Sequence, residues 1–203
     1  MTTKTINLYT FDELSDSAKE KARDWYRNAS CGDSFWSECV IDEAKEQASL
    51  IGFDVDDVLW SGFAAQGDGA CFIGKWHAKD FVGGIAEGWG ENDATTEIKK
   101  IADSFKEWAE KYPNLLVKIT HRDRYCHERS VDYDFIFSDE NDYQIDEPES
   151  FKYKDFQEDC VRFFKWIYKQ LEKEYEYQNS DEVIDELLEG NSYTFTVEGK
   201  RED

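Results

Sequence analysis

The stretch FDVDDVLWSGFAAQGDGACFIGKWH, residues 53–77, decides how this chain folds. Its first part places apolar residues such as Val55 and Val58 among acidic ones, which indicates a strand with one buried face. The segment Gln66–Gly69 is typical of a turn, because Gly and Asp tolerate left-handed backbone conformations. The segment Cys71–Trp76 predicts a returning strand, so the whole stretch predicts a long β-hairpin.

Helical periodicity is found on both sides of this hairpin. Apolar residues recur at three- and four-residue steps in five segments, which are residues 11 or 15 to 29, about 34 to 51, 98–112, 156–175 and 183–188. Alternating apolar residues predict a second hairpin from residues 115–119 and 131–137, and a last strand at 193–197. Hairpins separated by long helices predict an α+β fold, with an antiparallel sheet and the long helices packed on one face. The expected organisation is a single domain over residues 1–203.

The formal net charge of −22 limits the classes of molecule that the protein can bind. Asp and Glu number 46 against 24 Lys and Arg, and aromatic residues make up 16% of the chain. This charge repels nucleic acid and anionic membranes and attracts basic surfaces, while disordered acidic chains lack so many aromatics. No stretch approaches the roughly 18 uncharged apolar residues of a membrane helix. The sequence therefore predicts a folded protein with no membrane contact and no direct nucleic-acid contact.

The cysteines and the N-terminal residues indicate the cellular compartment in which the protein is expected. The five cysteines are scattered and odd in number, unlike a disulfide scaffold. The segment Met1–Asn7 has no apolar signal-peptide core. A cytoplasmic location with mostly buried thiols is expected.

An acidic run without any basic residue spans residues 139–150. It is expected to be a solvated loop, and its carboxylates are the candidate protein-binding surface. The candidate residues are Asp139, Glu140, Asp142, Asp146, Glu147 and Glu149. The alternative is that these charges only keep an aromatic-rich protein soluble.

The main basic cluster of the chain lies in the segment that joins the strands of the second hairpin. Its arginines could hold a phosphate-bearing ligand by bidentate hydrogen bonds, with the first hairpin as a pocket wall. The candidate ligand-binding residues are Arg122, Arg124, Arg129, Gln66, Asp68, Trp60 and Trp76. The alternatives are that these arginines pair with carboxylates of the chain, and that the glycine-rich segment is only a hairpin turn.

Motifs for catalysis and metal binding are incomplete. No Ser/His/Asp or Cys/His arrangement has a recognisable spacing, and His121, Cys126 and His127 lack the spacing of a zinc site. An EF-hand loop starting at residue 139 would have Gln144 where Gly is required and Ser150 where Glu is required. No catalytic residue, metal ligand or cofactor is therefore assigned. Acids of the first hairpin leave a metal-dependent phosphohydrolase as a further alternative.

Two segments resemble a known group of proteins. The runs Leu8–Tyr26 and Ser61–Phe72 are similar to widespread acidic bacteriophage proteins that are loosely labelled "antitoxin of a toxin–antitoxin stability system", with the best similarity over residues 6–76. The resemblance implies a phage origin and expression in the host bacterial cytoplasm. It carries no catalytic residues over to this chain.

The expected function is therefore binding rather than catalysis. The favoured hypothesis is a phage-encoded, non-enzymatic counter-defence or antitoxin-like protein. Its acidic surface would inhibit a host defence or toxin protein with a basic face, by mimicry of nucleic acid. The alternative is a sponge that sequesters a cyclic or linear nucleotide immune signal in an aromatic and arginine-lined pocket. The oligomeric state stays open.

Overall fold

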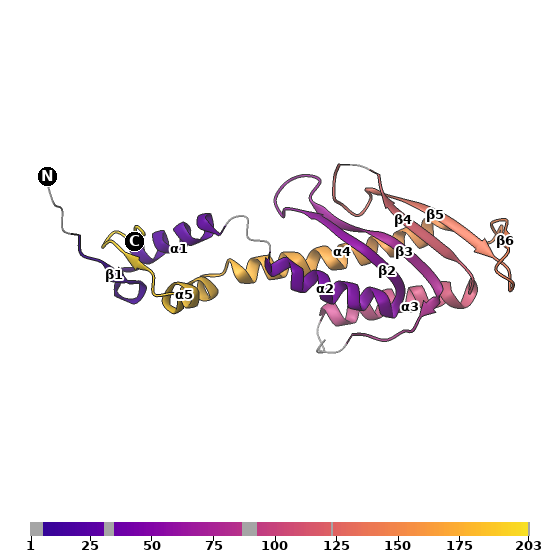
Figure 1. Ribbon diagram of the computed structural model, residues 1–203, viewed down its shortest axis with the longest axis horizontal. Helices are drawn as coiled ribbons and strands as arrows, with labels where there is room; N and C mark the ends of the chain where they lie inside the picture. Colours follow the sequence, from indigo (N-terminus) through magenta and orange to yellow (C-terminus); the bar gives the residue numbers. More distant parts are fainter. Residues whose placement is uncertain (1–5, 31–34, 87–92, 123, 203) are drawn as a thin grey trace. The chain divides into compact units, whose positions relative to one another are not determined.

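The chain divides into two compact units in the computed structural model (Figure 1). The structure describes residues 6–30, 35–86, 93–122 and 124–202. Unit 1 comprises residues 1–37 and 173–203, and unit 2 comprises residues 38–172. The boundary falls within the helices α2 (Phe35–Leu50) and α4 (Tyr153–Gln178). The expectation of a single domain over residues 1–203 stays a prediction.

Unit 2 is built on an antiparallel sheet of five strands in the order β2-β3-β4-β5-β6, so that each strand lies beside its neighbour in the sequence. The strands are β2 (Ile51–Ser61), β3 (Gly69–Phe81), β4 (Leu116–His121), β5 (Val131–Ser138) and β6 (Gln144–Ile145). Both expected hairpins are present, β2 with β3 and β4 with β5. The described residues thus confirm the α+β class with an antiparallel sheet.

One segment of the sheet differs from the expectation. Residues 139–150 were expected to be loop throughout, but β6 lies within them. It pairs with the end of β5, where Ile145 faces Phe137 and Gln144 faces Ser138. A strand of two residues is too short for alternation to be recognised among acidic neighbours, which is why the sequence pattern does not predict it.

Long helices cover one face of this sheet (Figure 1). Helix α3 (Asp93–Lys111) and helix α4 bury broad apolar stripes, as their periodicity predicts. In α4 the adjacent Phe163 and Phe164 are both fully buried. The opposite face of the sheet carries exposed charges that are neighbours in register, such as Lys75 with Lys118, and Lys75 Nζ lies 3.1 Å from Asp54 Oδ2.

Trp76 lies at the centre of the unit 2 core. Its side chain is 0% exposed, and its indole Nε1–H donates a hydrogen bond to the Ile51 carbonyl oxygen at 2.8 Å. Its ring lies against Phe53 of β2, Phe105 of α3 and Phe156 of α4, with centroids 5.2 to 6.5 Å apart. One aromatic side chain therefore ties the sheet to both helices.

Unit 1 has a small core of its own. Its elements are β1 (Tyr9–Thr10), the 3₁₀ helix η1 (Phe11–Glu13), α1 (Asp16–Ala29), α5 (Asp181–Gly190) and β7 (Thr194–Phe195). The strands β1 and β7 pair antiparallel, and buried residues such as Phe11 and Phe195 form the core cluster. Arg23 of α1 donates two hydrogen bonds to the Asp185 carboxylate of α5, at 2.6 and 2.7 Å, and this pairing raises the pKa of Arg23. The short helix expected near the C-terminus is confirmed as α5. Ser180 caps this helix, because its side chain accepts a hydrogen bond from the Val183 N–H.

Within the part of the chain that the structure describes, none of the helices has the length and apolar character needed to cross a bilayer.

Candidate functional site

The acidic run supplies the turn and the second strand, β6, of a β-hairpin whose first strand is β5, and we call residues Asp139–Glu149 the acidic hairpin. Asp139 builds its turn, because its Oδ1 accepts hydrogen bonds from the backbone N–H groups of Asn141 at 2.8 Å and Tyr143 at 3.0 Å. The Asp139 N–H also donates to the Tyr143 carbonyl oxygen at 2.9 Å. An Asp side chain that bonds the backbone two residues later is a recognised turn former. The tip of the hairpin is therefore fixed by its own hydrogen bonds.

A second contact attaches the tip to the sheet. Asp142 has a left-handed backbone with φ of 61°, and its Oδ1 lies 2.6 Å from Lys79 Nζ of β3. The hydrogen bond and the positive charge of Lys79 lower the pKa of the Asp142 carboxyl. Asp139 and Asp142 therefore have partners within the chain.

The other four acids of the hairpin face solvent. Among the described residues they form no ion pair, and they are Glu140, Asp146, Glu147 and Glu149. Two apolar side chains lie among them, Tyr143 with 72% of its surface exposed and Ile145 with 47%. Sequence reasoning had assigned the acids and missed these two side chains. Two apolar residues separated by one polar residue are too short a pattern to indicate a strand inside an acidic run, so the sequence offers no signal for these two side chains.

The arginine cluster is largely paired with groups of the chain. Arg122 Nη1 lies 3.2 Å from Asp132 Oδ1, and the two terminal guanidinium nitrogens of Arg129, Nη1 and Nη2, donate to Glu158, at 3.1 and 3.3 Å. The contact with Glu158 raises the pKa of Arg129. Arg124 lies over the ring of the neighbouring Tyr125, at 4.8 Å.

The other candidate ligand-binding residues are dispersed. Trp76 is inside the core, and Trp60 stacks on Phe63 with the centroids 5.6 Å apart. Gln66 is exposed, and Asp68 belongs to the turn between β2 and β3. The assignment of these residues to a ligand stays a prediction.

Asp68 has a clear role in that turn. Its Oδ2 accepts hydrogen bonds from the backbone N–H groups of Ala65 at 2.6 Å and Ala64 at 3.0 Å. These bonds, led by the one from Ala65, favour the ionised carboxylate and lower the pKa of Asp68. The carboxylate therefore organises the loop around the turn.

We expect the Asp68 turn to loosen at acidic pH. Because the pKa is lower in the folded state, its stabilising effect is complete above the unfolded-chain pKa of about 3.9 and is lost as the pH falls through the folded-state pKa. A carboxyl-detected NMR titration should place the Asp68 midpoint below that of an unstructured Asp peptide. The Ala64 and Ala65 amide signals should titrate with it and lose this dependence in Asp68→Asn. A midpoint equal to that of the peptide would contradict the expectation.

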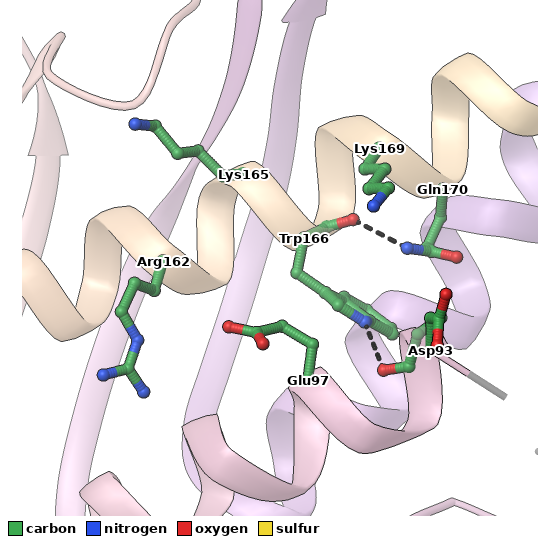
Figure 2. A pocket seen from close by; sticks show the side chains of 8 residues that line it. Asp93, Glu97, Arg162, Lys165, Trp166, Lys169 and Gln170 are labelled. Carbon is green, nitrogen blue, oxygen red and sulfur yellow. Dashed lines mark hydrogen bonds between the residues drawn. The ribbon is translucent and has the colours of Figure 1, made fainter. Parts of the chain in front are cut away.

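A hollow of about 190 Å³ lies between α3 and α4 (Figure 2). Its lining residues are Asp93, Ala94, Glu97, Arg162, Lys165, Trp166, Lys169 and Gln170. Trp166 forms its floor and donates from Nε1 to the Ala94 carbonyl oxygen at 3.0 Å. Arg162 pairs with Asp159 at 3.2 Å and Lys165 with Glu128 at 3.4 Å. Two acids and three bases line its walls, and two of the bases are already paired with carboxylates, so this hollow has no strong preference for either sign of ligand charge.

Among the residues that the structure describes, the thiols and potential metal ligands form no assembled centre. Cys71 and Cys160 are buried, and burial raises the pKa of Cys71 to about 12, which makes it a poor nucleophile. Over the described ranges, no group of three or more His, Cys, Asp or Glu residues is placed to hold a metal ion.

These features define an α+β protein with an antiparallel sheet, a helical layer on one face, and an acidic hairpin at the β6 edge of that sheet. The chain belongs to the DUF8835 family, a domain of unknown function, whose family model matches residues 36–181. No match was found among the curated proteins or among the solved structures. The matched range includes all of unit 2 with the acidic hairpin, whereas α1 and the last 22 residues lie outside it.

Proposed function

We propose that this chain is a non-enzymatic binding protein that docks its acidic hairpin onto a basic surface of another protein. The single observation that carries the proposal is the set of four exposed carboxylates, without ion pairs among the described residues, around Tyr143 and Ile145. An aromatic anchor within a charged rim is the usual composition of a protein-binding surface.

The hairpin is also preorganised. The Asp139 turn and the ion pair between Asp142 and Lys79 hold the tip in one conformation before any partner arrives. Binding through a fixed loop loses less conformational entropy than binding through a mobile one. Charge steers the encounter, and the apolar side chains supply the contact that slows dissociation.

The proposed biological setting combines this surface with the resemblance of residues 6–76 to acidic bacteriophage proteins. A folded body dense in carboxylates can occupy a basic groove that would otherwise bind the phosphates of nucleic acid. The proposed role is that of a phage-encoded counter-defence or antitoxin-like protein, acting on a host factor with a basic face in the bacterial cytoplasm. Nucleotide sequestration and metal-dependent phosphoryl chemistry stay as alternative predictions.

Charge neutralisation in the hairpin tests the proposal. The variant combines Glu140→Gln, Asp146→Asn, Glu147→Gln and Glu149→Gln. The matched control neutralises four exposed acids elsewhere in unit 2, namely Asp42→Asn, Glu43→Gln, Glu46→Gln and Glu107→Gln. Partners are captured from bacterial lysate on each immobilised protein, identified by mass spectrometry, and then measured as purified proteins by surface plasmon resonance.

We expect the purified partner to bind the hairpin variant at least about tenfold more weakly, with a smaller dependence on salt, while the control retains its affinity. Tyr143→Ala should accelerate dissociation and leave the salt dependence unchanged. If the acids only keep the protein soluble, the hairpin variant and the control should both keep their affinity for the partner, or lose it to the same extent. Either result would overturn the proposal.

A further inference from the structure

We infer that unit 1 carries a separate binding site for a small organic anion, in a hollow between α1 and the C-terminal turn. The hollow has a volume of about 340 Å³. Its lining residues are Lys21, Trp25, Glu198, Gly199, Lys200 and Arg201. All six lie outside residues 36–181, the range that the family model matches.

The hollow gathers the positive charge of an acidic unit. Unit 1 has seven described Lys and Arg residues against 14 described Asp and Glu residues. Three of those seven cations line the hollow, whereas Glu198 is its one acidic lining residue. Two of the remaining cations, Arg23 and Arg27, are already paired with Asp185 and Asp181. The sign of the charge in the hollow is thus opposite to that of the unit around it.

Two of the lining cations, Lys21 and Lys200, differ in whether they already form an ion pair within the chain. Lys200 Nζ lies 3.1 Å from Glu202 Oε1, so part of its charge is neutralised. Lys21 is exposed and forms no ion pair with the residues that the structure describes. Lys21 is therefore the cation with the most to gain from an anionic ligand.

The aromatic side chains at the site, Trp25 and Tyr193, position the Arg201 cation. Lys21 and Trp25 are four residues apart on α1 and so share one face of the helix. The Arg201 guanidinium lies against an edge-to-face pair of rings, 5.6 Å from the Trp25 centroid and 4.9 Å from the Tyr193 centroid. The planar cation is held in place by these rings, which prepares it to face an anion without a further loss of side-chain freedom.

The wall opposite α1 is a tight turn packed on the helix backbone. Thr196 N–H donates to the Lys200 carbonyl oxygen and Gly199 N–H to the Thr196 carbonyl oxygen, both at 2.8 Å. Gly199 has φ of +81°, and a Cβ atom there would lie 2.1 Å from the Ala18 carbonyl oxygen. The turn thus approaches α1 as closely as backbone allows, and the hollow exists before any ligand binds.

Size and lining together indicate the class of ligand. A volume of about 340 Å³ is at the lower end of the range for small-molecule sites. Cations around an indole suit a carboxylate or phosphate group carried on a flat or apolar body. An uncharged body would leave Lys21 without a counter-charge from the ligand, and a bare inorganic ion would leave the indole without a contact.

Isothermal titration calorimetry of the full chain tests this site. The probes are adenosine 5′-monophosphate and benzoate as ring-bearing anions, adenosine as the uncharged ring, and inorganic phosphate as the bare ion. We expect the two ring-bearing anions to bind with Kd below about 1 mM, and adenosine and phosphate to bind at least about fivefold more weakly. The absence of heat for both ring-bearing anions at that concentration would overturn the inference, as would equal binding of adenosine.

Lys21→Gln should weaken binding of the anions at least about threefold, because it removes the unpaired cation. Lys19→Gln is the matched control, since it removes the same charge from α1 at a position outside the lining, where Lys19 lies over the Phe11 ring at 5.0 Å. The control should bind as the unchanged protein does. Equal losses in the two variants would mean that the general charge of the unit, and not this hollow, governs binding.

Discussion

Replacing Trp76 with alanine is expected to lower the free energy of unfolding by about 4 kcal/mol, within the range for truncating a large buried aromatic side chain. The indole is fully buried, and its ring contacts Phe53, Phe105 and Phe156, so the cavity would border the sheet and both helices. The variant also leaves the Ile51 carbonyl oxygen without the hydrogen bond from Nε1.

Urea unfolding followed by circular dichroism measures this loss. Val82→Ala is the control, because Val82 is 76% exposed and its truncation should change the free energy of unfolding by less than about 0.5 kcal/mol. Trp76→Phe should fall between the two, because it retains a ring but cannot donate to Ile51. A loss of less than about 2 kcal/mol in Trp76→Ala would show that the neighbouring rings close over the cavity, and would contradict the central position given to Trp76.

The sequence predicts the fold best where a periodic pattern is long. Helix α4 extends over 26 residues, and its apolar residues recur often enough to define one buried side. The hairpin of β2 and β3 is predicted because two long strands flank a Gly-Asp-Gly turn. Strand β6 is missed because two residues are shorter than the period that would reveal them.

The candidate sites are predictable in composition but not in arrangement. The acidic run 139–150 is evident in the sequence, and the structure places it in a hairpin. Its attachment through Lys79 and Asp142 joins residues 63 positions apart, which only the folded sheet brings together. The same is true of Arg129 and Glu158, since nothing in the local sequence says which carboxylate an arginine will meet.

The hollow of unit 1 is still harder to predict from the sequence, because its walls come from opposite ends of the chain. Lys21 and Trp25 share a helix face that periodicity can predict, but Lys200 and Arg201 come from the other end of the chain. Their convergence depends on a contact between the backbone of Gly199 and that of Ala18. That contact gives a prediction of its own.

We expect Gly199→Ala to destabilise unit 1 by about 2 to 3 kcal/mol and to weaken binding of adenosine 5′-monophosphate at least about tenfold. The positive φ disfavours any residue with a Cβ atom, and the added methyl group would overlap the Ala18 carbonyl oxygen. Because that oxygen belongs to the backbone of α1, the turn has to move away from the helix. Such a movement separates Lys200 and Arg201 from Lys21 and opens the hollow.

Amide hydrogen exchange of α1 and β7, together with calorimetry, separates this effect from general instability. Gly190→Ala is the matched control, because it makes the same substitution in unit 1 where a Cβ atom would meet nothing within 4 Å. The control should keep its protection and its affinity, and alanine at the end of α5 is at least as good a helix former as glycine. If Gly199→Ala also keeps its hydrogen-exchange protection and its affinity, the close approach of the turn to α1 does not shape the hollow. If it loses protection but keeps its affinity, the ligand is held elsewhere than between the turn and the helix.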